Sequence, residues 1–361
     1  MITRYALGAL LIMIMLLCGA TLLLRAQETY ILCVNSGDSA IDCGIFSIKN
    51  NKPQLLFVLQ TKNEDISNFT DAVCDIITRV KNYHAITIQH ACFSAPGVPS
   101  ANQDYLTHWR LPYAIDAKEI IKKSGLKTAI IINNFLALSY GVDAIDEKDI
   151  TPLHDVPAEL HGQRAIIGAG DGLGSVVMVW NEEKNSYMSL PAEAGTGNFP
   201  AFTQFEFDLA ERMKQERGFD TVHWAFFVAV PGIEYTYKIL KNMNRYEDSL
   251  HMVNPDGLAI LAHAHDDELC KETANLFFKI YARFAYNFVW TTLPFGGLYL
   301  VGSTATDYPE LLSEIFLPEF FNCVPSKQEL VKRVPVFVIH AEDNVKLYGA
   351  AHYLLLEKNI A

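Results

Sequence analysis

The stretch Ala129-Ile130-Ile131-Ile132-Asn133-Asn134-Phe135 decides the fold. Its aliphatic residues, with three isoleucines in a row, are typical of a β-strand that is buried on both faces. The strand ends at Asn133 and Asn134, and the apolar residues that follow predict a helix. In open α/β sheets ligands bind at the carboxyl ends of the strands. We therefore expect an α/β fold with a ligand site at these two asparagines.

The composition indicates two domains with a large core. A chain of 361 residues fits two domains of roughly 100–200 residues each, and half of its residues are hydrophobic. The net charge of −12 argues against nucleic acid as a partner, because phosphate contacts need clustered Lys and Arg. The seven cysteines stand singly, without a Cys-x-x-Cys pair, so neither a metal site nor a disulfide framework is predicted.

The amino terminus carries an apolar run over residues 5–24, flanked by Arg4 and Arg25. About 20 apolar residues are what a helix needs to cross a hydrocarbon core of about 30 Å. We expect residues 1–27 to be a membrane anchor, with a cleaved signal peptide as the alternative, although Leu24-Arg25-Ala26 matches a cleavage site poorly. The small excess of positive charge before the run favours a globular part on the periplasmic face, with the cytoplasmic face as the alternative.

Helix patterns follow from the spacing of apolar residues. Residues 66–83 have the periodicity of an amphipathic helix. Asp116, with Glu119 three residues later, predicts a helix start with a capping box. Residues 259–293 predict one long helical region, whose large apolar side chains recur every four residues.

Two turns contain glycine, which lets the backbone approach a ligand closely. The first follows the strand 30–34 and contains Asn35, Gly37 and Ser39; a polar hairpin loop is the alternative interpretation. The second runs from Gly168 to Gly174 between two apolar strands. Each turn also holds a carboxylate, Asp38 in the first and Asp171 in the second, which repels phosphate.

These segments, in one colinear order from Tyr30 onward, resemble the bacterial-type glucokinase family of the actin-like superfamily. The family's signature here is Ile-Asn-Asp-Phe, whose Asp takes the proton from the 6-hydroxyl of the sugar. In this chain the position is Asn134, and an amide is no base. Residues 190–199 resemble the family's Pro-Gly-Glu-Gly-Gly-His segment, with Glu193 kept and Thr196 in place of the histidine. A second family glutamate corresponds to Ala225.

The resemblance implies two sets of site residues. The sugar-binding set is Asn133, Asn134, Glu193 and Thr196, with Asn134 at the catalytic position. The nucleotide-binding set is Asn35, Gly37, Ser39, Gly170, Asp171, Gly172, Gly174, Gly296, Gly297 and Gly302. In the first turn Asn35 and Asp38 replace a family Asp and Gly, and in the second Asp171 replaces a Thr.

The expected architecture is two actin-like (RNase H-like) α/β domains around a cleft, preceded by one transmembrane helix. Residues 28–145 form the small domain, completed by about 345–361, and residues 146–344 form the large domain. We expect a catalytically degenerate sugar-kinase homologue, which is a membrane-tethered binding or structural part of a protein assembly and needs neither cofactor nor metal. One alternative is an active ATP-dependent glucokinase that uses Mg-ATP to phosphorylate glucose at the 6-hydroxyl. The other is a hexose sensor that has lost ATP. A protein partner is expected, and a homodimer is left open.

Overall fold

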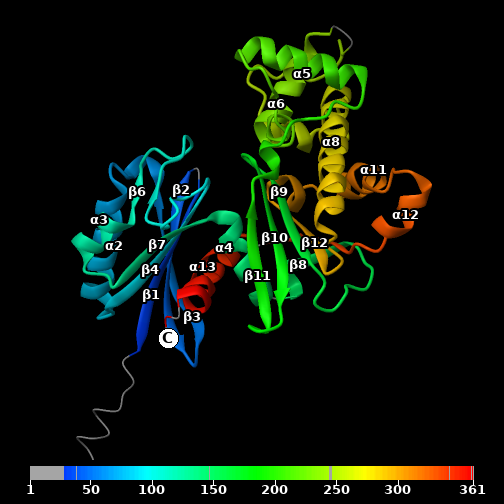
Figure 1. The fold of residues 1–361 in the computed structure, drawn as a ribbon. Helices are drawn as coiled ribbons and strands as arrows, with labels where there is room; N and C mark the ends of the chain where they lie inside the picture. Colours follow the sequence, from blue (N-terminus) through cyan, green and yellow to red (C-terminus); the bar gives the residue numbers. More distant parts are fainter. Residues whose placement is uncertain are drawn as a thin grey trace, which may run out of the picture. The chain divides into compact units, whose positions relative to one another are not determined.

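The chain forms two compact units in the computed structural model, which describes residues 28–37, 39–145, 147–243, 246–340, 342–358 and 360 (Figure 1). Unit 1 comprises the described residues up to Phe93, residues 98–131 and those from Ala351 onward. Unit 2 comprises residues 94–97 and 132–350. The chain therefore enters unit 2 before the helix that follows Asn133, whereas the predicted small domain extends to residue 145.

Unit 1 is built on a five-stranded sheet with the strand order β3-β2-β1-β4-β7. Its first three strands form an antiparallel meander, in which Tyr30 lies opposite Ser47 and Phe46 lies opposite Leu55. Two short strands form a separate ribbon. The strands are β1 (Thr29–Ser36), β2 (Ala40–Lys49), β3 (Lys52–Lys62), β4 (Ile88–Ala95), β5 (Tyr105–Leu106), β6 (Ile115–Asp116) and β7 (Thr128–Asn133).

Two capped helices, α2 (Phe69–His84) and α3 (Ala117–Ser124), pack against each other in unit 1. The helix expected from residue 66 begins at Phe69, because the side chain of Asn68 accepts the N–H of Asp71 at 3.0 Å. The predicted cap of the second helix is confirmed: Asp116 Oδ1 accepts the N–H of Glu119 at 2.9 Å.

The strand expected at Ala129–Ile132 is confirmed as β7, and these four residues are buried. The strand nevertheless lies at an edge of the sheet. Part of that edge is covered, because the N–H of Ile131 donates to the carbonyl oxygen of Gln103 at 2.8 Å. Covering an edge in this way keeps its backbone groups from pairing with another chain.

Unit 2 is built on a six-stranded sheet with the order β11-β10-β9-β12-β13-β8 (Figure 1). The central strand β9 is antiparallel to β10 and parallel to β12, which is itself parallel to β13. Parallel neighbours need long crossovers, and a series of short helices joins β12 to β13. The strands are β8 (Ile150–His154), β9 (Arg164–Ala169), β10 (Leu173–Asn181), β11 (Ser186–Ala192), β12 (Gly297–Val301) and β13 (Val336–Ile339).

The helices after β7 belong to unit 2, except for the end of the last one. They are α4 (Asn134–Gly141), α5 (Gln204–Arg217), α6 (Val230–Lys241), α7 (Gly257–Ala262), α8 (Glu268–Thr292), α9 (Ser303–Thr306), α10 (Pro309–Leu311), α11 (Leu317–Phe320), α12 (Pro325–Val331) and α13 (Glu342–Lys358). From Ala351 onward α13 belongs to unit 1, where Gln103 Nε2 donates to Tyr353 Oη at 2.7 Å.

The prediction of one helix over residues 259–293 was wrong at its start. The chain forms α7, a turn over residues 263–267, and only then α8. The break has a local cause: Asp267 is the N-cap of α8, and its Oδ1 accepts the N–H of Cys270 at 2.8 Å. An N-cap residue has a non-helical backbone, so it ends any continuous helix that would run through it.

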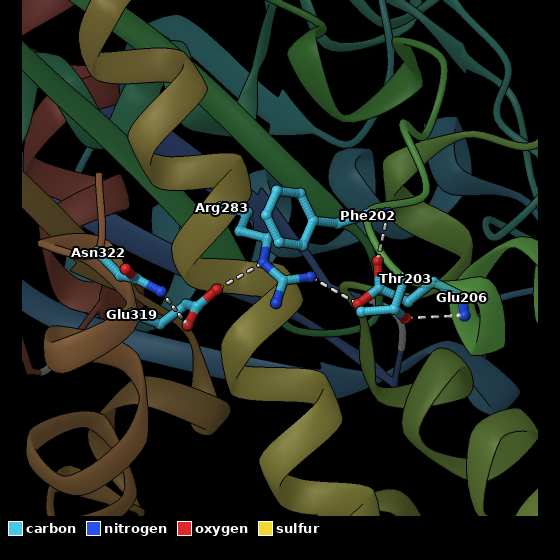
Figure 2. Close-up of polar contacts among 6 residues, drawn as sticks. All are labelled: Phe202, Thr203, Glu206, Arg283, Glu319 and Asn322. Atoms are coloured by element: carbon cyan, nitrogen blue, oxygen red, sulfur yellow. Dashed lines mark hydrogen bonds and ion pairs between the residues drawn. The ribbon is translucent and has the colours of Figure 1, made fainter. Parts of the chain in front are cut away.

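Helix α8 carries the core of unit 2 and a charged cluster that joins it to α5 and α11 (Figure 2). Arg283 donates from Nη1 to Glu206 at 2.5 Å and from Nε to Glu319 at 2.6 Å. Glu206 is only 1% exposed, and its second oxygen accepts the N–H of Phe202 at 2.7 Å. The guanidinium also lies 4.5 Å from the centre of the Phe202 ring. Both oxygens of the buried Glu206 carboxylate therefore accept hydrogen bonds.

The expected membrane localisation needs correction. Within the described ranges, no helix is both long enough and apolar enough to cross a bilayer. The apolar run at 5–24, on which the prediction rested, lies outside those ranges.

Candidate functional site

Asn133 fixes the junction between β7 and α4 in unit 2. Its Oδ1 accepts the N–H groups of Phe135 at 2.8 Å and Leu136 at 3.3 Å, which makes it the N-cap of α4. Its Nδ2 donates to the carbonyl oxygen of Gly97 at 2.9 Å. The side chain of Asn133 therefore connects the turn at residues 94–97 to the start of α4. The prediction of Asn133 as a sugar ligand did not include this structural role.

Asn134 is the first residue of α4, and its side chain is half-buried. Among the described residues it has no hydrogen-bond partner, so its amide is available to a ligand. An amide both donates and accepts hydrogen bonds but does not take up a proton near neutral pH. This position can orient a hydroxyl group but cannot deprotonate it.

Phe135 joins α4 to the strands on either side of the second glycine turn. Its ring lies over Gly174 and Gly168, where a Cβ built on each glycine would come within 1.9 Å and 3.0 Å of ring atoms. No real Cβ approaches a ring carbon at 1.9 Å, so the glycine at 174 is required by packing. The contact places the asparagine pair beside β9 and β10.

The second glycine turn, from Gly170 to Gly172, links β9 to β10 and is held from two sides. Thr304 Oγ1 donates to the carbonyl oxygen of Ala169 at 2.6 Å. The N–H of Val230 donates to the carbonyl oxygen of Gly170 at 2.8 Å. Within the turn, the N–H of Gly170 donates to Gly172 O at 2.9 Å, so it does not point to a ligand. Asp171 is exposed.

Glu193 and Thr196 lie beside β10 and next to the same turn. The 3₁₀ turn Ala194–Thr196 is anchored by Ser175, whose Oγ accepts the N–H of Ala194 at 3.2 Å. Gly195 packs so closely on Leu173 that a Cβ would lie 2.3 Å from its carbonyl oxygen. Glu193 and Thr196 are exposed. Three of the predicted segments therefore lie together: the end of β7, the turn at Gly170 and the turn at Glu193.

The predicted glycines of β12 lie at opposite ends of this strand. Gly302 follows its carboxyl end with φ +93°, and its Cβ would lie 2.8 Å from Ala169 O, so this glycine adjoins the turn at Gly170. Gly296 and Gly297 precede or begin the strand at its other end, five residues away, or about 16 Å along an extended chain. Gly296 packs against the backbone of Gly162, which accounts for its lack of a side chain.

A hollow of about 530 Å³ adjoins Gly302 at the carboxyl ends of β12 and β13. Three carboxylates line it; Lys346 pairs with Glu342 at 2.7 Å and with Asp343 at 3.6 Å, so the net charge of the hollow stays negative through Asp307. The lining residues are Gly302, Ser303, Thr306, Asp307, His340, Glu342, Asp343 and Asn344. Such a wall is unfavourable for a triphosphate.

The remaining predicted residues lie at the hairpin of β1 and β2 in unit 1. Asn35 is a buried residue of β1 opposite Asp42 in β2, whereas Gly37 and Ser39 lie in the turn that follows. Asp38 lies outside the described residues. The N–H of Gly37 donates to Ala40 O at 2.9 Å, within the turn.

Asn63, which sequence reasoning missed, secures the turn. Its Nδ2 donates to Gly37 O at 2.9 Å, its N–H donates to Ser39 O at 2.8 Å, and its Oδ1 accepts from Tyr113 Oη at 3.1 Å. Burial raises the pKa of Tyr113 to about 12, so its hydroxyl stays a donor at neutral pH.

A second residue that the sequence did not single out is His223, just before the 3₁₀ turn Trp224–Phe226. Its Nδ1 lies within hydrogen-bond distance of the carbonyl oxygen of Thr196. Ala225, the position of the missing second glutamate, lies in the turn that follows and is partly buried. No spacing in the sequence connects residues 196 and 223; tertiary contacts, among them the isolated bridge between Asn198 and His223, bring them together.

Comparison with known proteins gives one consistent result. The family model described as Glucokinase matches residues 39–357. The glucokinase of Nostoc punctiforme is 27% identical over 282 residues, which cover 73% of this chain and 81% of the relative.

Two solved structures share the fold. The glucokinase from Balamuthia mandrillaris in complex with glucose has a TM-score of 0.76 at 19% identity, covering 91% of this chain and 94% of the other. The glucokinase from an Antarctic psychrotroph has a TM-score of 0.73 at 21% identity, covering 92% and 100%. At these identities the structural likeness establishes the mixed α/β sugar-kinase fold.

Proposed function

Because the chain belongs to the glucokinase family, we propose that it binds a hexose at the end of β7 but does not transfer phosphate to it at an ordinary kinase rate. The observation that carries this proposal is Asn134, which begins α4 where the resemblance places the catalytic Asp. Loss of a general base costs on the order of 10²–10⁴ in rate.

The fit to ATP supports the same proposal. The N–H groups of Gly170 and Gly37 donate within their own turns, to Gly172 and Ala40. A phosphate-binding turn needs such groups to point at the ligand. The exposed carboxylates of Asp171 and of Asp307, which lines the hollow beside Gly302, add repulsion. The residues present therefore do not fit a bound triphosphate.

The sugar side fits better. Asn134 has an amide available to hydroxyl groups, and Glu193 is exposed on a turn that β10 holds in place. Its fold is that of a structure that was solved with glucose. A protein partner for such a hexose-binding protein stays a prediction.

A second candidate function is ATP-dependent phosphorylation of glucose. The observation in its favour is the comparison itself: the Nostoc punctiforme relative is named glucokinase, and the match covers 81% of its length. This function requires another group to act as the base, and it requires both glycine turns to rearrange when ATP binds.

Calorimetric titration of the full chain with glucose and then with Mg-AMPPNP, together with a coupled assay for glucose 6-phosphate, separates the two functions. The proposal predicts heat of binding for glucose, none for the nucleotide at millimolar concentration, and no product above the buffer rate. Turnover at about 1 s⁻¹ or faster, which is the ordinary range for enzymes, would overturn the proposal and establish the second candidate.

The variant Asn134→Asp sharpens the comparison. If the chain binds ATP and lacks only its base, the variant raises turnover by about 10²–10⁴. If the turns exclude ATP, turnover stays at the buffer rate. Asn185→Asp is the control, since it adds the same charge at an exposed position of unit 2, in the loop between β10 and β11.

A further inference from the structure

The segment around His223 is attached to the turn that carries Glu193 and Thr196. His223 Nδ1 contacts the carbonyl oxygen of Thr196, and the N–H of Trp224 donates to Gly197 O at 3.1 Å. A backbone bridge pairs Asn198 with His223. The imidazole is therefore held against this turn by both its backbone and its ring.

The contact with Thr196 sets the tautomer of the ring. A carbonyl oxygen can only accept a hydrogen bond, so the proton of the neutral imidazole lies on Nδ1. Nε2 then carries a lone pair and acts as an acceptor. Within the described part of the chain Nε2 has no hydrogen-bond partner, and the side chain is only partly buried. The ring of Phe226, 5.6 Å away between centroids, limits its rotation.

Thr196 also makes hydrogen bonds to the backbone of Glu193. The N–H and the Oγ1 of Thr196 both donate to the carbonyl oxygen of Glu193, at 3.0 Å and 2.7 Å. His223 Nε2 is thus an open acceptor beside the turn that carries Glu193. A ligand that pairs with this nitrogen must supply a hydrogen-bond donor, as the hydroxyl groups of a sugar do.

We propose that His223 is a specificity-determining residue of the hexose site: its Nε2 accepts a hydrogen bond from a sugar hydroxyl beside Glu193. This inference rests on the proposed hexose binding. Binding there keeps the neutral Nδ1–H tautomer, because a protonated ring would present a donor to the hydroxyl instead of an acceptor.

Histidine-labelled full-length protein allows a direct test by ¹⁵N NMR, with the signal of His223 assigned among the eleven histidines by its loss in a variant. We expect the Nδ1–H tautomer without ligand and a shift of the Nε2 resonance as glucose is added. The Nε2–H tautomer in the free protein, or an unmoved resonance when glucose is bound, would overturn the inference.

Glucose titrations of His223→Phe and His223→Ala give the energetic test. Phenylalanine keeps a ring against Phe226 and removes both nitrogens. Since one neutral hydrogen bond contributes about 1 kcal/mol, both variants should bind glucose about five- to tenfold more weakly. The control is His263→Ala, because His263 also pairs through Nδ1, with Asp266 at 3.3 Å, but lies between α7 and α8.

The outcomes separate the two proposals. If the wild type binds glucose and the His223 variants bind it equally well, the inference fails and hexose binding stands. If the wild type binds no glucose at millimolar concentration, hexose binding fails and the role of His223 falls with it. If one of the two His223 variants does not fold, the other one assigns the signal of His223, and the NMR measurement on the wild type then decides.

Discussion

Phe135 lies on Gly174 so closely that a single methyl group on the glycine would come within 1.9 Å of a ring carbon. This contact links the first turn of α4 to β10. Gly174→Ala should therefore destabilise the protein by about 1–3 kcal/mol, the usual cost of overpacking a core. The free energy of unfolding from urea denaturation measures it. Gly170→Ala, in the same turn region but with no heavy atom within 4 Å of the added methyl group, should stay within about 0.5 kcal/mol of the wild type. Equal effects of the two variants would contradict the packing argument.

Asn133 and Asn134 are neighbours with different structural roles. Asn133→Ala removes the cap of α4 and the bond to Gly97, so we expect a loss of about 1–3 kcal/mol. Asn134→Ala removes a side chain that has no hydrogen-bond partner among the described residues, and its effect on stability should be below about 0.5 kcal/mol. Thermal and urea unfolding of both variants check this difference. A larger loss for Asn134→Ala would show that the assignment of the cap is wrong.

The charged cluster in Figure 2 predicts a large effect for one substitution. Arg283→Met leaves the carboxylate of Glu206, which is 1% exposed, without its partner, and should cost about 3–5 kcal/mol. The double variant Glu206→Leu with Arg283→Met should recover part of that loss, because it removes the most deeply buried charge and leaves only the carboxylate of Glu319, whose side chain is 13% exposed, without Arg283.

Arg212→Met is the matched control for Arg283→Met. Arg212 pairs with Glu216 on the exposed face of α5, where an ion pair contributes less than about 1 kcal/mol. A small effect of Arg283→Met, comparable to that of the control, would mean that Glu206 finds another partner or water.

The cap of α8 should make stability depend on acidity. Burial works to raise the pKa of Asp267, but the N–H groups of Cys270 and Leu250 outweigh it and hold the pKa below its usual value. Since the pKa is lower in the folded state, this residue contributes stability above about pH 4, and the contribution is lost as the pH falls through the folded-state value.

Asp267→Asn should therefore be less stable than the wild type at pH 7 by about 0.5–2 kcal/mol, with the gap closing towards pH 3. Urea midpoints at the two pH values measure the gap. Asp256→Asn, at the exposed cap of α7, serves as control. A gap that stays the same at pH 3 would rule out the proposed linkage.

The sequence predicts several of the strands and helix caps, because these signals act locally. Residues 129–132 and the cap at Asp116 are examples. It also predicts the family, which the match over residues 39–357 confirms. The prediction of a single helix over residues 259–293 was wrong for a local reason too. Asp267 is an N-cap that interrupts an otherwise helical pattern.

The candidate site was harder to predict, because its supporting contacts join residues far apart in the chain. The resemblance assigns a histidine to the position of Thr196; the structure brings His223 against that residue from another segment. Asn63 reaches the turn at Gly37 in the same way, across 26 positions. Neither Asn63 nor His223 belongs to a periodic pattern in the sequence that would single it out. Gly296 and Gly302 look equivalent in sequence, yet β12 separates them.

The bond between Gln103 and Tyr353 spans 250 positions of the chain and lies inside unit 1. On the ribosome, at about 5–20 residues per second, the second partner is made on the order of ten to fifty seconds after the first. Throughout that interval the early strands of unit 1 exist without the last turns of α13. Because these strands stay exposed in the nascent chain, we expect chaperones to bind them. Truncation at the carboxyl end should likewise destabilise unit 1, although most of that unit is synthesised first.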